Sequence, residues 1–362
     1  YPGKRYYGGQ EYVDVVERAA IERAKELFGA GFANVQPLSG SPANLSVFFA
    51  LLNPGDKVLG LALDHGGHLS HGHPVNASGI LYNFVQYTVE KDTGRIDMNK
   101  VREIALRERP KLILAGFSAY SRDLDWKAFK SIADEVGAYT MADIAHIAGL
   151  VAGKAIESPM SCFDVVTTTT HKTLRGPRGA LILTNNADLA KKFDRAIFPG
   201  MQGGPHIPQI VAKAVAFGEA LRPAFGKYAK NVIANAQRLS SRLTENGFSV
   251  ISGGTDNHLI VVDMTSKGMA GKEAEVLLDE VGISSSRSTI PFDSRKPLDP
   301  SGLRLGAAAI TTRGFGLEQV DIVASVINRA VENKGNESVL KGLRAEVSDL
   351  CLQYPLFAPM VD

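Results

Sequence analysis

The sequence predicts an α/β protein in which a mostly parallel sheet is followed by a smaller C-terminal α+β domain. Short apolar runs alternate with helical segments through the first part of the chain. Strands that alternate with helices need crossover connections, which favour parallel pairing and a sheet covered on both faces. After Pro205 the order changes to long helices followed by closely spaced strands, which is typical of an α+β domain. We therefore predict two domains, residues 1–220 and 221–362.

The individual elements follow from periodicity and from turn residues. The first is a helix, because "EYVDVVERAAIERAKELFG" has apolar residues at helical spacing and stops at Gly29. The sheet strands are predicted in "KVLGLAL", "KLILAGFS", "AYTMADI", "DVVTTTT" and "ALILTN", with helices in "DMNKVREIALRER" and "WKAFKSIADEVG". Beyond Pro205 a long helical stretch runs from "HIPQIVAKAVAFGEALRPAF" through "NVIANAQRLSSRLTENG". The last strands are predicted in "FSVISGG", "NHLIVVDM", "GISSSR" and "SGLRLG", with a helix in "GKEAEVLLDEVG".

Composition and charge argue against several classes of function. The 362 residues carry a net charge of only +2 and no dense basic block, so nucleic acid is not an expected partner. No apolar run approaches the roughly 20 residues that span a bilayer, and we expect a soluble protein without a membrane partner. The two cysteines, Cys162 and Cys351, suggest neither a disulfide framework nor a metal cluster, so we expect a reducing cytoplasm.

A lysine follows directly on one predicted strand. The run "VVTTTT" is β-branched throughout, and Gly176, Pro177 and Gly179 end the strand in a loop. Lys172 therefore lies at the carboxyl end of a strand, where open α/β sheets bind their ligands. A single lysine on a loop is more often a plain surface group, so a chemical role needs support from other residues.

The segment Ser39-Gly40-Ser41-Pro42 opens a predicted helix. We predict Ser41 as its N-cap, with Pro42 in the first turn. Free N–H groups, the positive helix end and two hydroxyls together suit a phosphate group. Taken alone, however, the motif is more typical of a plain helix cap.

Acidic and imidazole groups follow two other predicted strands. Asp143 and His146 come at the end of "AYTMADI", and a carboxylate buried there needs a cationic partner such as a protonated pyridine nitrogen. The stretch "LDHGGHLSHGHP" contains His65, His68, His71 and His73. No cysteine or carboxylate pattern accompanies them, so we predict no metal and favour an imidazole that stacks on an aromatic cofactor. A cradle, an acid, a stacking ring and a strand-end amine are together the parts of a pyridoxal 5'-phosphate site.

Nine stretches of the chain, in order, resemble the serine hydroxymethyltransferases. They are "YPGKRYYGG", "NVQPLSGSPAN", "GGHLSHG", "GFSAYS", "DIAHIAGLVA", "TTTTHKTLRGPRG", "FPGMQGGP", "SGGTDNHL" and "SGLRLGAAAITTRG". The resemblance implies the fold-type-I architecture of pyridoxal phosphate enzymes and a role in one-carbon metabolism. It implies transfer of the hydroxymethyl carbon of serine to tetrahydrofolate, which gives glycine and 5,10-methylenetetrahydrofolate. It also implies a homodimer or a dimer of dimers whose active sites are each built from two chains.

The resemblance further implies a role for each matched residue. Lys172 resembles the Schiff-base lysine, Asp143 the partner of the pyridine nitrogen, and His68 the histidine that stacks on the ring. The other matched cofactor residues are His146 and Ser118 near the phenolic oxygen, Ser39, Gly40, Ser41 and His171 at the phosphate, Gly204 from the neighbouring subunit, and Asn44 and Thr169. Arg304 resembles the arginine that binds the substrate carboxylate, which suits a planar guanidinium. The remaining matches are Tyr7 as a catalytic residue across the dimer, Tyr6 near the folate and the serine hydroxyl, and Leu63, Gly67 and Leu69 at the pterin.

Two points separate this chain from the family pattern. Phe292 stands where some members have an asparagine near the pterin, which leaves the folate contacts open. Members also carry an N-terminal arm of roughly fifty to sixty residues before "YPGKRYYGG", longer than an ordinary loop. That arm embraces the partner subunit and supplies a glutamate for proton transfer and folate chemistry. We therefore expect either a longer protein than the printed sequence or a truncated form whose folate-dependent step is impaired.

Other functions remain open at this point. A folate-independent β-hydroxy amino acid aldolase, similar to threonine aldolase, or an aminotransferase would share the fold but not "YPGKRYYGG" or "GGHLSHG". A non-catalytic scaffold or RNA-binding regulator would have no need of Lys172, Asp143 and Arg304, and the near-neutral charge argues against nucleic acid.

Overall fold

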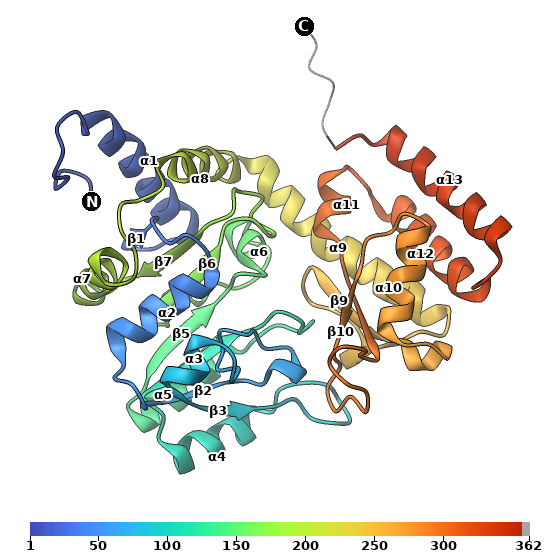
Figure 1. Cartoon of the computed structure of the whole chain (residues 1–362), viewed down its shortest axis with the longest axis horizontal. Coiled ribbons are helices and arrows are strands. Elements are labelled where there is room, and N and C mark those ends of the chain that lie inside the picture. Colours follow the sequence, from blue (N-terminus) through green and yellow to red (C-terminus); the bar gives the residue numbers. More distant parts are fainter. Residues whose placement is uncertain (357–362) are drawn as a thin grey trace, which may run out of the picture.

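The computed structural model describes residues 1–356, which form two lobes around two separate sheets (Figure 1). The first lobe is built on seven strands in the order β1-β7-β6-β5-β4-β2-β3. Their bounds are β1 Phe32–Asn34, β2 Lys57–Leu61, β3 Asn83–Tyr87, β4 Leu112–Gly116, β5 Tyr139–Asp143, β6 Val165–Thr169 and β7 Ala180–Thr184. Strands β2 to β6 pair in parallel, whereas β7 is antiparallel to both β6 and β1. The predicted mostly parallel sheet is confirmed.

The antiparallel strand β7 has a simple cause. A parallel neighbour requires a crossover of a dozen or more residues, usually through a helix. Only a short loop without a helix joins Thr169 to Ala180, so the chain can return only in the opposite direction. This loop carries Lys172.

Both faces of the first sheet are buried, as the alternation of its side chains requires. Along β4, Ile113 and Ala115 face one core, whereas Leu112 and Leu114 face the other. Helices α1 (Glu11–Phe28), α4 (Met98–Glu108), α5 (Trp126–Val136), α6 (Ala148–Ala152) and α8 (Ile207–Ala220) contribute to the first core. Helices α2 (Gly40–Leu51) and α7 (Ala187–Arg195) contribute to the second, and α3 (Ala77–Leu81) packs nearby. As predicted, α1 ends at Gly29, whose φ of 68° is left-handed.

The second lobe has its own sheet and core. Strands β10 (Ser286–Ser288), β11 (Gly302–Gly306), β9 (Leu259–Asp263) and β8 (Ser249–Val250) form an antiparallel sheet in that order. Helices α10 (Gly271–Glu280), α12 (Leu317–Glu332) and α13 (Glu337–Gln353) pack with it, and α11 (Ala308–Thr312) follows β11. No helix within residues 1–356 combines the length and the apolar character that a membrane crossing needs.

One long helix, α9 (Pro223–Glu245), belongs to both lobes (Figure 1). Its residues Phe225 and Val232 lie in a core of the first lobe, whereas Leu239 and Leu243 lie in the core of the second. The division predicted after residue 220 thus falls just before a helix that the two cores share. The helical stretch expected here is two helices, because Pro223 starts α9 at a position where its missing N–H costs nothing.

Some strands were not predicted from the sequence, or were predicted longer than they are. Strand β3 was missed because its residues are mostly half-exposed at the sheet edge, which removes a clear apolar run. Strand β1 has only three residues. In "FSVISGG" only Ser249 and Val250 pair, since Ser252 at φ 60° turns the chain away from the sheet.

Helix α6 supports the Lys172 loop so closely that only glycine fits at residue 149. A Cβ there would lie 2.1 Å from the carbonyl oxygen of Thr173. Because α6 is buried along its length, it has little room to move away. We predict that Gly149→Ala lowers the free energy of unfolding by about 3 kcal/mol, as overpacking does, in urea titrations.

The matched control is Gly342→Ala in α13, where an added Cβ meets nothing within 4 Å. That change should leave stability unaltered or raise it by up to about 1 kcal/mol, since alanine favours helix. Equal stability of the two variants would contradict the packing described for α6.

Candidate active site

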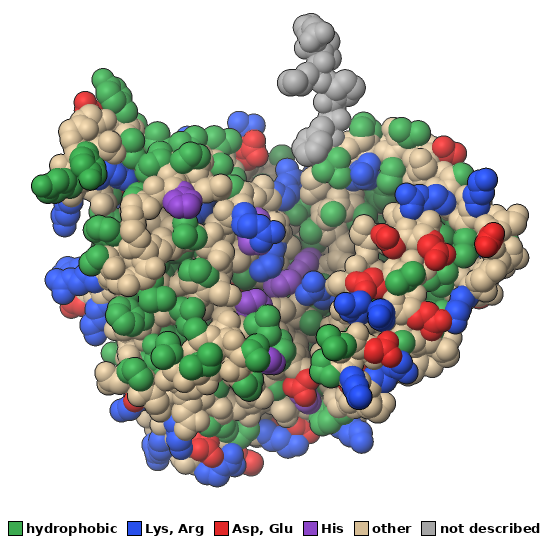
Figure 2. All heavy atoms as spheres, viewed as in Figure 1, with side chains coloured by type: hydrophobic (Ala, Val, Ile, Leu, Met, Phe, Trp, Pro, Cys, Tyr) green, Lys and Arg blue, Asp and Glu red, His purple; other side chains and the backbone are tan. Residues whose placement is uncertain are grey.

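The carboxyl ends of the parallel strands face the second lobe across a hollow, in which Figure 2 shows histidine and basic side chains gathered. Two cavities adjoin there, of about 290 and 840 Å³. Both are lined by His146, His171 and Lys172. The smaller cavity is otherwise lined by Ser39, Gly40, Ser41, His68, Phe117, Ser118, Asp143, Ala145, Thr169 and Arg178. The larger one adds Arg304, His258 and other residues of the second lobe.

Lys172 lies three residues beyond β6, where the chain leaves the sheet. Its Nζ donates a hydrogen bond to Thr169 Oγ1 over 3.3 Å. Burial lowers the pKa of Lys172; the carboxylate of Asp143 opposes this shift and the Arg304 guanidinium adds to it. A larger fraction of this amine is therefore unprotonated near neutral pH, which is the form that attacks a carbonyl carbon.

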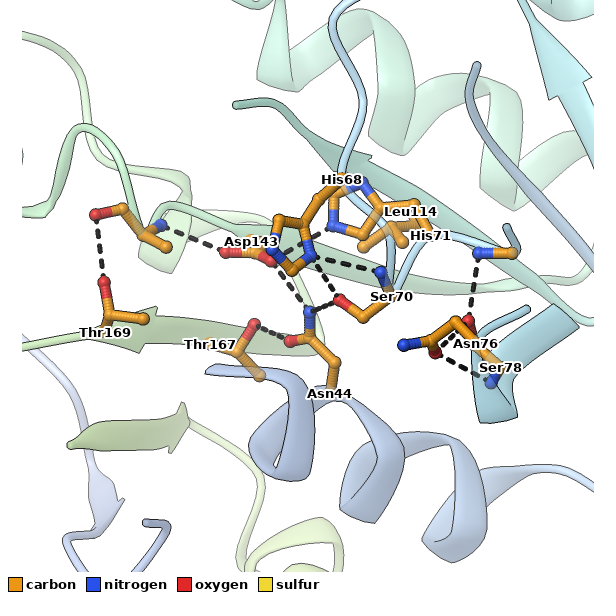
Figure 3. A network of polar contacts seen from close by, with 12 residues as sticks. Asn44, His68, Ser70, His71, Asn76, Ser78, Leu114, Asp143, Thr167 and Thr169 are labelled. Carbon is orange, nitrogen blue, oxygen red and sulfur yellow. Dashed lines mark hydrogen bonds and ion pairs between the residues drawn. The ribbon is translucent and has the colours of Figure 1, made fainter. Parts of the chain in front are cut away.

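Asp143, the last residue of β5, is held on several sides (Figure 3). Its Oδ2 accepts a hydrogen bond from Asn44 Nδ2 at 2.8 Å and lies 3.1 Å from His71 Nε2. Its Oδ1 accepts from the backbone N–H of Ala145 at 3.0 Å. Burial alone would raise the pKa of Asp143, but the hydrogen bonds from His71 and Asn44 outweigh it and hold that pKa well below its usual range. A buried, ionised carboxylate at a cavity wall suits a cationic ring nitrogen.

The amide of Asn44 is fixed in turn. It donates to Ser70 Oγ at 3.0 Å, and its oxygen accepts from Thr167 Oγ1 at 2.7 Å (Figure 3). Because Thr167 lies on β6 and Asn44 on α2, the carboxylate is held by a helix and a strand together. Asn44 itself lines neither cavity, and its place beside the cofactor stays a prediction.

His68 lies in the loop after β2, with its ring beside Asp143 in Figure 3. Its Nδ1 accepts the backbone N–H of Ser70 at 3.1 Å and lies 2.7 Å from Ser70 Oγ. Because Nδ1 accepts, a neutral ring carries its proton on Nε2. Burial lowers the pKa of His68, so the ring is neutral at pH 7 and suited to stacking.

A pair of imidazole rings, one from each lobe, lies where the two lobes meet. The rings of His146 and His258 stack with centroids 5.5 Å apart, and His146 Nδ1 lies 3.4 Å from His258 Nε2. Burial, with the cations Arg304 and Lys172 adding to it, lowers the pKa of His258 to about 3. The pKa of His146 is likewise well below its usual value, first through burial. Both rings are therefore neutral.

The start of α2 differs from the prediction at one position, while its role as a phosphate cradle stays a prediction. The N-cap is Ser39, in extended conformation, and the helix begins at Gly40, so the prediction of Ser41 as N-cap was wrong. Proline is tolerated throughout the first turn, whose N–H groups lack helical partners, so Pro42 does not fix the cap position. A Cβ at residue 40 would lie 2.8 Å from Thr169 Cγ2, which favours glycine there.

Arg304 comes from the middle of β11 in the second lobe. One of its N–H groups donates to the carbonyl of Ser118 in the first lobe at 2.9 Å. The guanidinium lines the larger cavity together with Lys172. A cation that faces the cavity at this position suits a carboxylate ligand.

Besides Asn44, six predicted residues line neither cavity. Tyr6 and Tyr7 are 95% and 77% exposed. Gly204 is exposed in the loop before α8. Leu63, Gly67 and Leu69 lie in the loop after β2; there a Cβ at residue 67 would lie 2.2 Å from the carbonyl oxygen of Leu61. Because these residues were assigned wholly or partly to contacts between chains or with folate, their roles stay predictions.

Several residues of the site have no role predicted from the sequence. His71 was noted only as one of four clustered histidines, and it contacts an aspartate 72 positions away. His258 and Arg178 were not considered, although both stand inside quoted motifs. Phe292 packs edge-on against His65, with ring centroids 4.8 Å apart. Within residues 1–356, no three or more histidine, cysteine or acidic side chains gather as a metal site would need.

The residues present fit pyridoxal phosphate. The smaller cavity offers an amine, an ionised carboxylate and a helix start with two serines. Ser118 Oγ and His171 Nδ1 are buried there without a partner among the described residues. Such atoms are costly unless a ligand satisfies them, so their positions favour a polar, anionic ligand.

Comparison with known proteins agrees with this geometry. Residues 1–327 match the family model described as "Serine hydroxymethyltransferase". A protein of that name from Rippkaea orientalis is 55% identical over 359 residues, which are 99% of this chain and 84% of that protein. One from Prochlorococcus marinus (strain MIT 9313) is 56% identical over 356 residues, or 98% of this chain and 83% of the relative.

The lowered pKa of Lys172 predicts its reactivity. In the cofactor-free chain, reductive methylation with formaldehyde and dimethylamine-borane at pH 8 should modify Lys172 faster than the exposed Lys341, since burial lowers the pKa of Lys172 and leaves more of its amine unprotonated. Lowering the pH through the pKa of Lys172 should slow its modification, because less of its amine is then unprotonated. Peptide mapping by mass spectrometry measures both rates, and added pyridoxal phosphate should protect Lys172. Equal rates at pH 8 would contradict the prediction.

Proposed function

The chain belongs to the serine hydroxymethyltransferase family, and from this we propose which of its residues carry the family's reaction. It is a pyridoxal phosphate-dependent enzyme that reversibly transfers the hydroxymethyl carbon of serine to tetrahydrofolate and so yields glycine and 5,10-methylenetetrahydrofolate. The observation that supports the residue assignment best is that Lys172, Asp143 and Arg304 converge on one hollow from three different elements.

When bound, pyridoxal phosphate supplies an electron sink for the bond that breaks at the substrate α-carbon. We propose that Lys172 binds it covalently through its amine and that the ionised Asp143 keeps its ring nitrogen protonated. His68 offers the flat face of a neutral ring. Ser39, Gly40, Ser41 and His171 hold the phosphate, and Thr169 keeps Lys172 in place by accepting its hydrogen bond.

Arg304 binds the substrate carboxylate in this proposal. A guanidinium binds a carboxylate through two parallel hydrogen bonds, which fixes the direction of the substrate as well as its position. His146 has its Nδ1 beside His258, so its Nε2 remains to exchange a proton with the substrate or the cofactor's phenolic oxygen. At pH 7 the ring of His146 is neutral and so has one nitrogen that can accept a proton and one N–H that can donate. Ser118, whose Oγ has no hydrogen-bond partner in the described part of the chain, is the other group that we assign to the phenolic oxygen.

The active assembly is, in our proposal, a homodimer or a dimer of dimers. Several large apolar side chains of the first lobe are exposed, among them Leu38, Phe49, Leu69, Val75, Ile80, Phe198 and Met201. Contiguous exposed apolar surface marks an interaction site, and Figure 2 shows apolar side chains scattered densely over this lobe. Gly204, assigned across the interface, lies close to Met201 in the sequence, and the proposed pterin contacts Leu63 and Gly67 lie close to Leu69. Tyr6 and Tyr7, also assigned across the interface, are exposed as well.

The compartment that we propose is the cytoplasm. Cys162 and Cys351 are both free thiols in the structure, which suits a reducing environment. The proposed partners are the small substrates and further copies of the chain; nucleic acid is not among them, given a net charge of +2.

Isotope transfer tests the function directly. The purified holoenzyme is mixed with serine labelled with ¹³C at carbon 3 and with tetrahydrofolate, and ¹³C NMR follows the label. We expect the label in the methylene bridge of the folate product and equimolar unlabelled glycine. Release of label from serine at the same rate without folate would indicate a folate-independent aldolase instead.

Arg304→Ala sharpens the same test. The serine KM should rise by about 30-fold or more, because a buried charge-assisted pair is lost, while pyridoxal phosphate stays bound. Arg304→Lys should restore little, since lysine lacks the planar fork. The matched control is Arg313→Lys. The Arg313 side chain donates hydrogen bonds to the carbonyls of Cys351 and Tyr354, and its replacement should leave the serine KM unchanged. An unchanged KM in Arg304→Ala would contradict the assignment.

A further inference from the structure

A fully buried lysine lies behind the cofactor site, outside both cavities. Lys213, on α8, is 1% exposed. Its Nζ donates hydrogen bonds to three backbone carbonyls, those of Val35 at 2.6 Å, Pro37 at 3.1 Å and Ala180 at 3.0 Å. Three acceptors match the three N–H groups of an ammonium, and within residues 1–356 the side chain has no other hydrogen-bond partner.

The three carbonyls belong to two different loops. Val35 and Pro37 follow β1, which ends at Asn34, and lead directly into the cradle Ser39–Ser41. Ala180 is the first residue of β7 and closes the loop that begins after β6 and carries Lys172. Lys213 therefore ties the chain before the cradle to the chain after the lysine loop.

Burying a lysine at position 213 is energetically unfavourable. Burial lowers its pKa to about 7, with Glu17 opposing the shift, and an apolar side chain would fill the same space without that penalty. An apolar side chain, however, would provide no hydrogen-bond donors for the three carbonyls. Because β1 ends at Asn34, the carbonyl of Val35 is beyond the strand ladder, and a buried carbonyl without a donor is unfavourable.

Neighbouring contacts also hold the two loops together. The carbonyl of Pro37 also accepts the backbone N–H of Ala180 at 3.1 Å, so the two loops touch directly at this point. A Cβ at residue 179 would lie 2.4 Å from Lys213 Cε, which shows how closely the lysine stem packs against the loop. Gln202 holds the same segment from another side, through the carbonyl of Gln36 and the N–H of Leu38, each at 3.1 Å.

We propose that Lys213 is a positioning residue of the cofactor site: its three hydrogen bonds hold the cradle at a fixed place relative to the Lys172 loop and thereby set the affinity for the cofactor's phosphate. The inference rests on the proposed phosphate-binding role of Ser39–Ser41. Lys213 itself touches no ligand. Its removal should leave Lys172, Asp143 and Arg304 in place but let the cradle shift away from the phosphate.

The test compares two ligands in the full-length chain. Lys213→Met keeps the length of the stem and removes all donors. Its dissociation constant for pyridoxal phosphate should rise by about 10- to 100-fold, the range seen when residues that support a binding shell are lost. The dissociation constant for 5'-deoxypyridoxal, which lacks the phosphate, should change by less than about 3-fold, within the usual uncertainty of such comparisons. Both are measured by equilibrium dialysis on protein whose fold is checked by circular dichroism.

Two further variants separate positioning from general stability. Asn235→Leu removes a buried donor in the second lobe, where the amide bonds Thr311 Oγ1 and the carbonyl of Phe315. It should lower stability to urea without changing the affinity for pyridoxal phosphate. Lys213→Gln retains two N–H donors and should recover part of that affinity, and it serves alone if Lys213→Met does not fold.

The outcomes separate the inference from its premise. If wild-type protein bound pyridoxal phosphate no more tightly than 5'-deoxypyridoxal, the cradle assignment itself would be wrong. If wild type favours the phosphate but Lys213→Met or Lys213→Gln keeps the same preference, the inference about Lys213 is overturned. Equal losses for both ligands would show a purely structural lysine and overturn it too.

Discussion

The rest of the site depends on one buried negative charge, the carboxylate of Asp143. It stands at the end of β5, in the middle of the first sheet, with only 9% of its surface exposed. Hydrogen bonds from Asn44, His71 and the backbone of Ala145 keep it ionised. Removing one partner from such a buried charge typically costs about 3–5 kcal/mol, so the surrounding residues are constrained by it. In the proposed mechanism, the protonated ring nitrogen of the cofactor is the cationic partner of this carboxylate.

The second constraint is that the site lies between two lobes. Arg304 donates a hydrogen bond across to the carbonyl of Ser118, and His258 stacks on His146, so the second lobe supplies the group that we propose for binding the substrate carboxylate and the neighbour of the proposed proton-transfer residue. Helix α9 runs through both cores and keeps the lobes together. The positive groups Lys172 and Arg304 in turn help to keep the two imidazoles neutral. The electrostatics of the hollow thus combines the fixed anion Asp143, cations that include Lys172, Arg178 and Arg304, and several neutral imidazole rings.

The sequence predicted this architecture where local signals are strong. Apolar runs identified the central strands, and the β-branched run before Lys172 placed the amine at the correct edge of the sheet. Prediction from the sequence failed where the deciding contact joins residues far apart along the chain. His71 contacts Asp143, and Lys213 donates hydrogen bonds to Val35 and Ala180, but no local sequence pattern indicates these contacts. The N-cap was predicted at Ser41 instead of Ser39 because either serine leaves Pro42 within the first turn of the helix and so satisfies the same local preferences. Roles that need a second chain, such as that of Tyr7, remain beyond what one chain tests.

The most direct test of the central claim is the protonation state of the cofactor nitrogen. Holoenzyme is prepared with pyridoxal phosphate labelled with ¹⁵N in the ring, and ¹⁵N NMR is recorded at pH 8 for the wild type and for Asp143→Asn. A neutral amide cannot stabilise the cation as a carboxylate does. We predict the chemical shift of a protonated nitrogen in the wild type and that of a neutral one in the variant. A neutral nitrogen in the wild type, or the same protonated nitrogen in both proteins, would contradict the account.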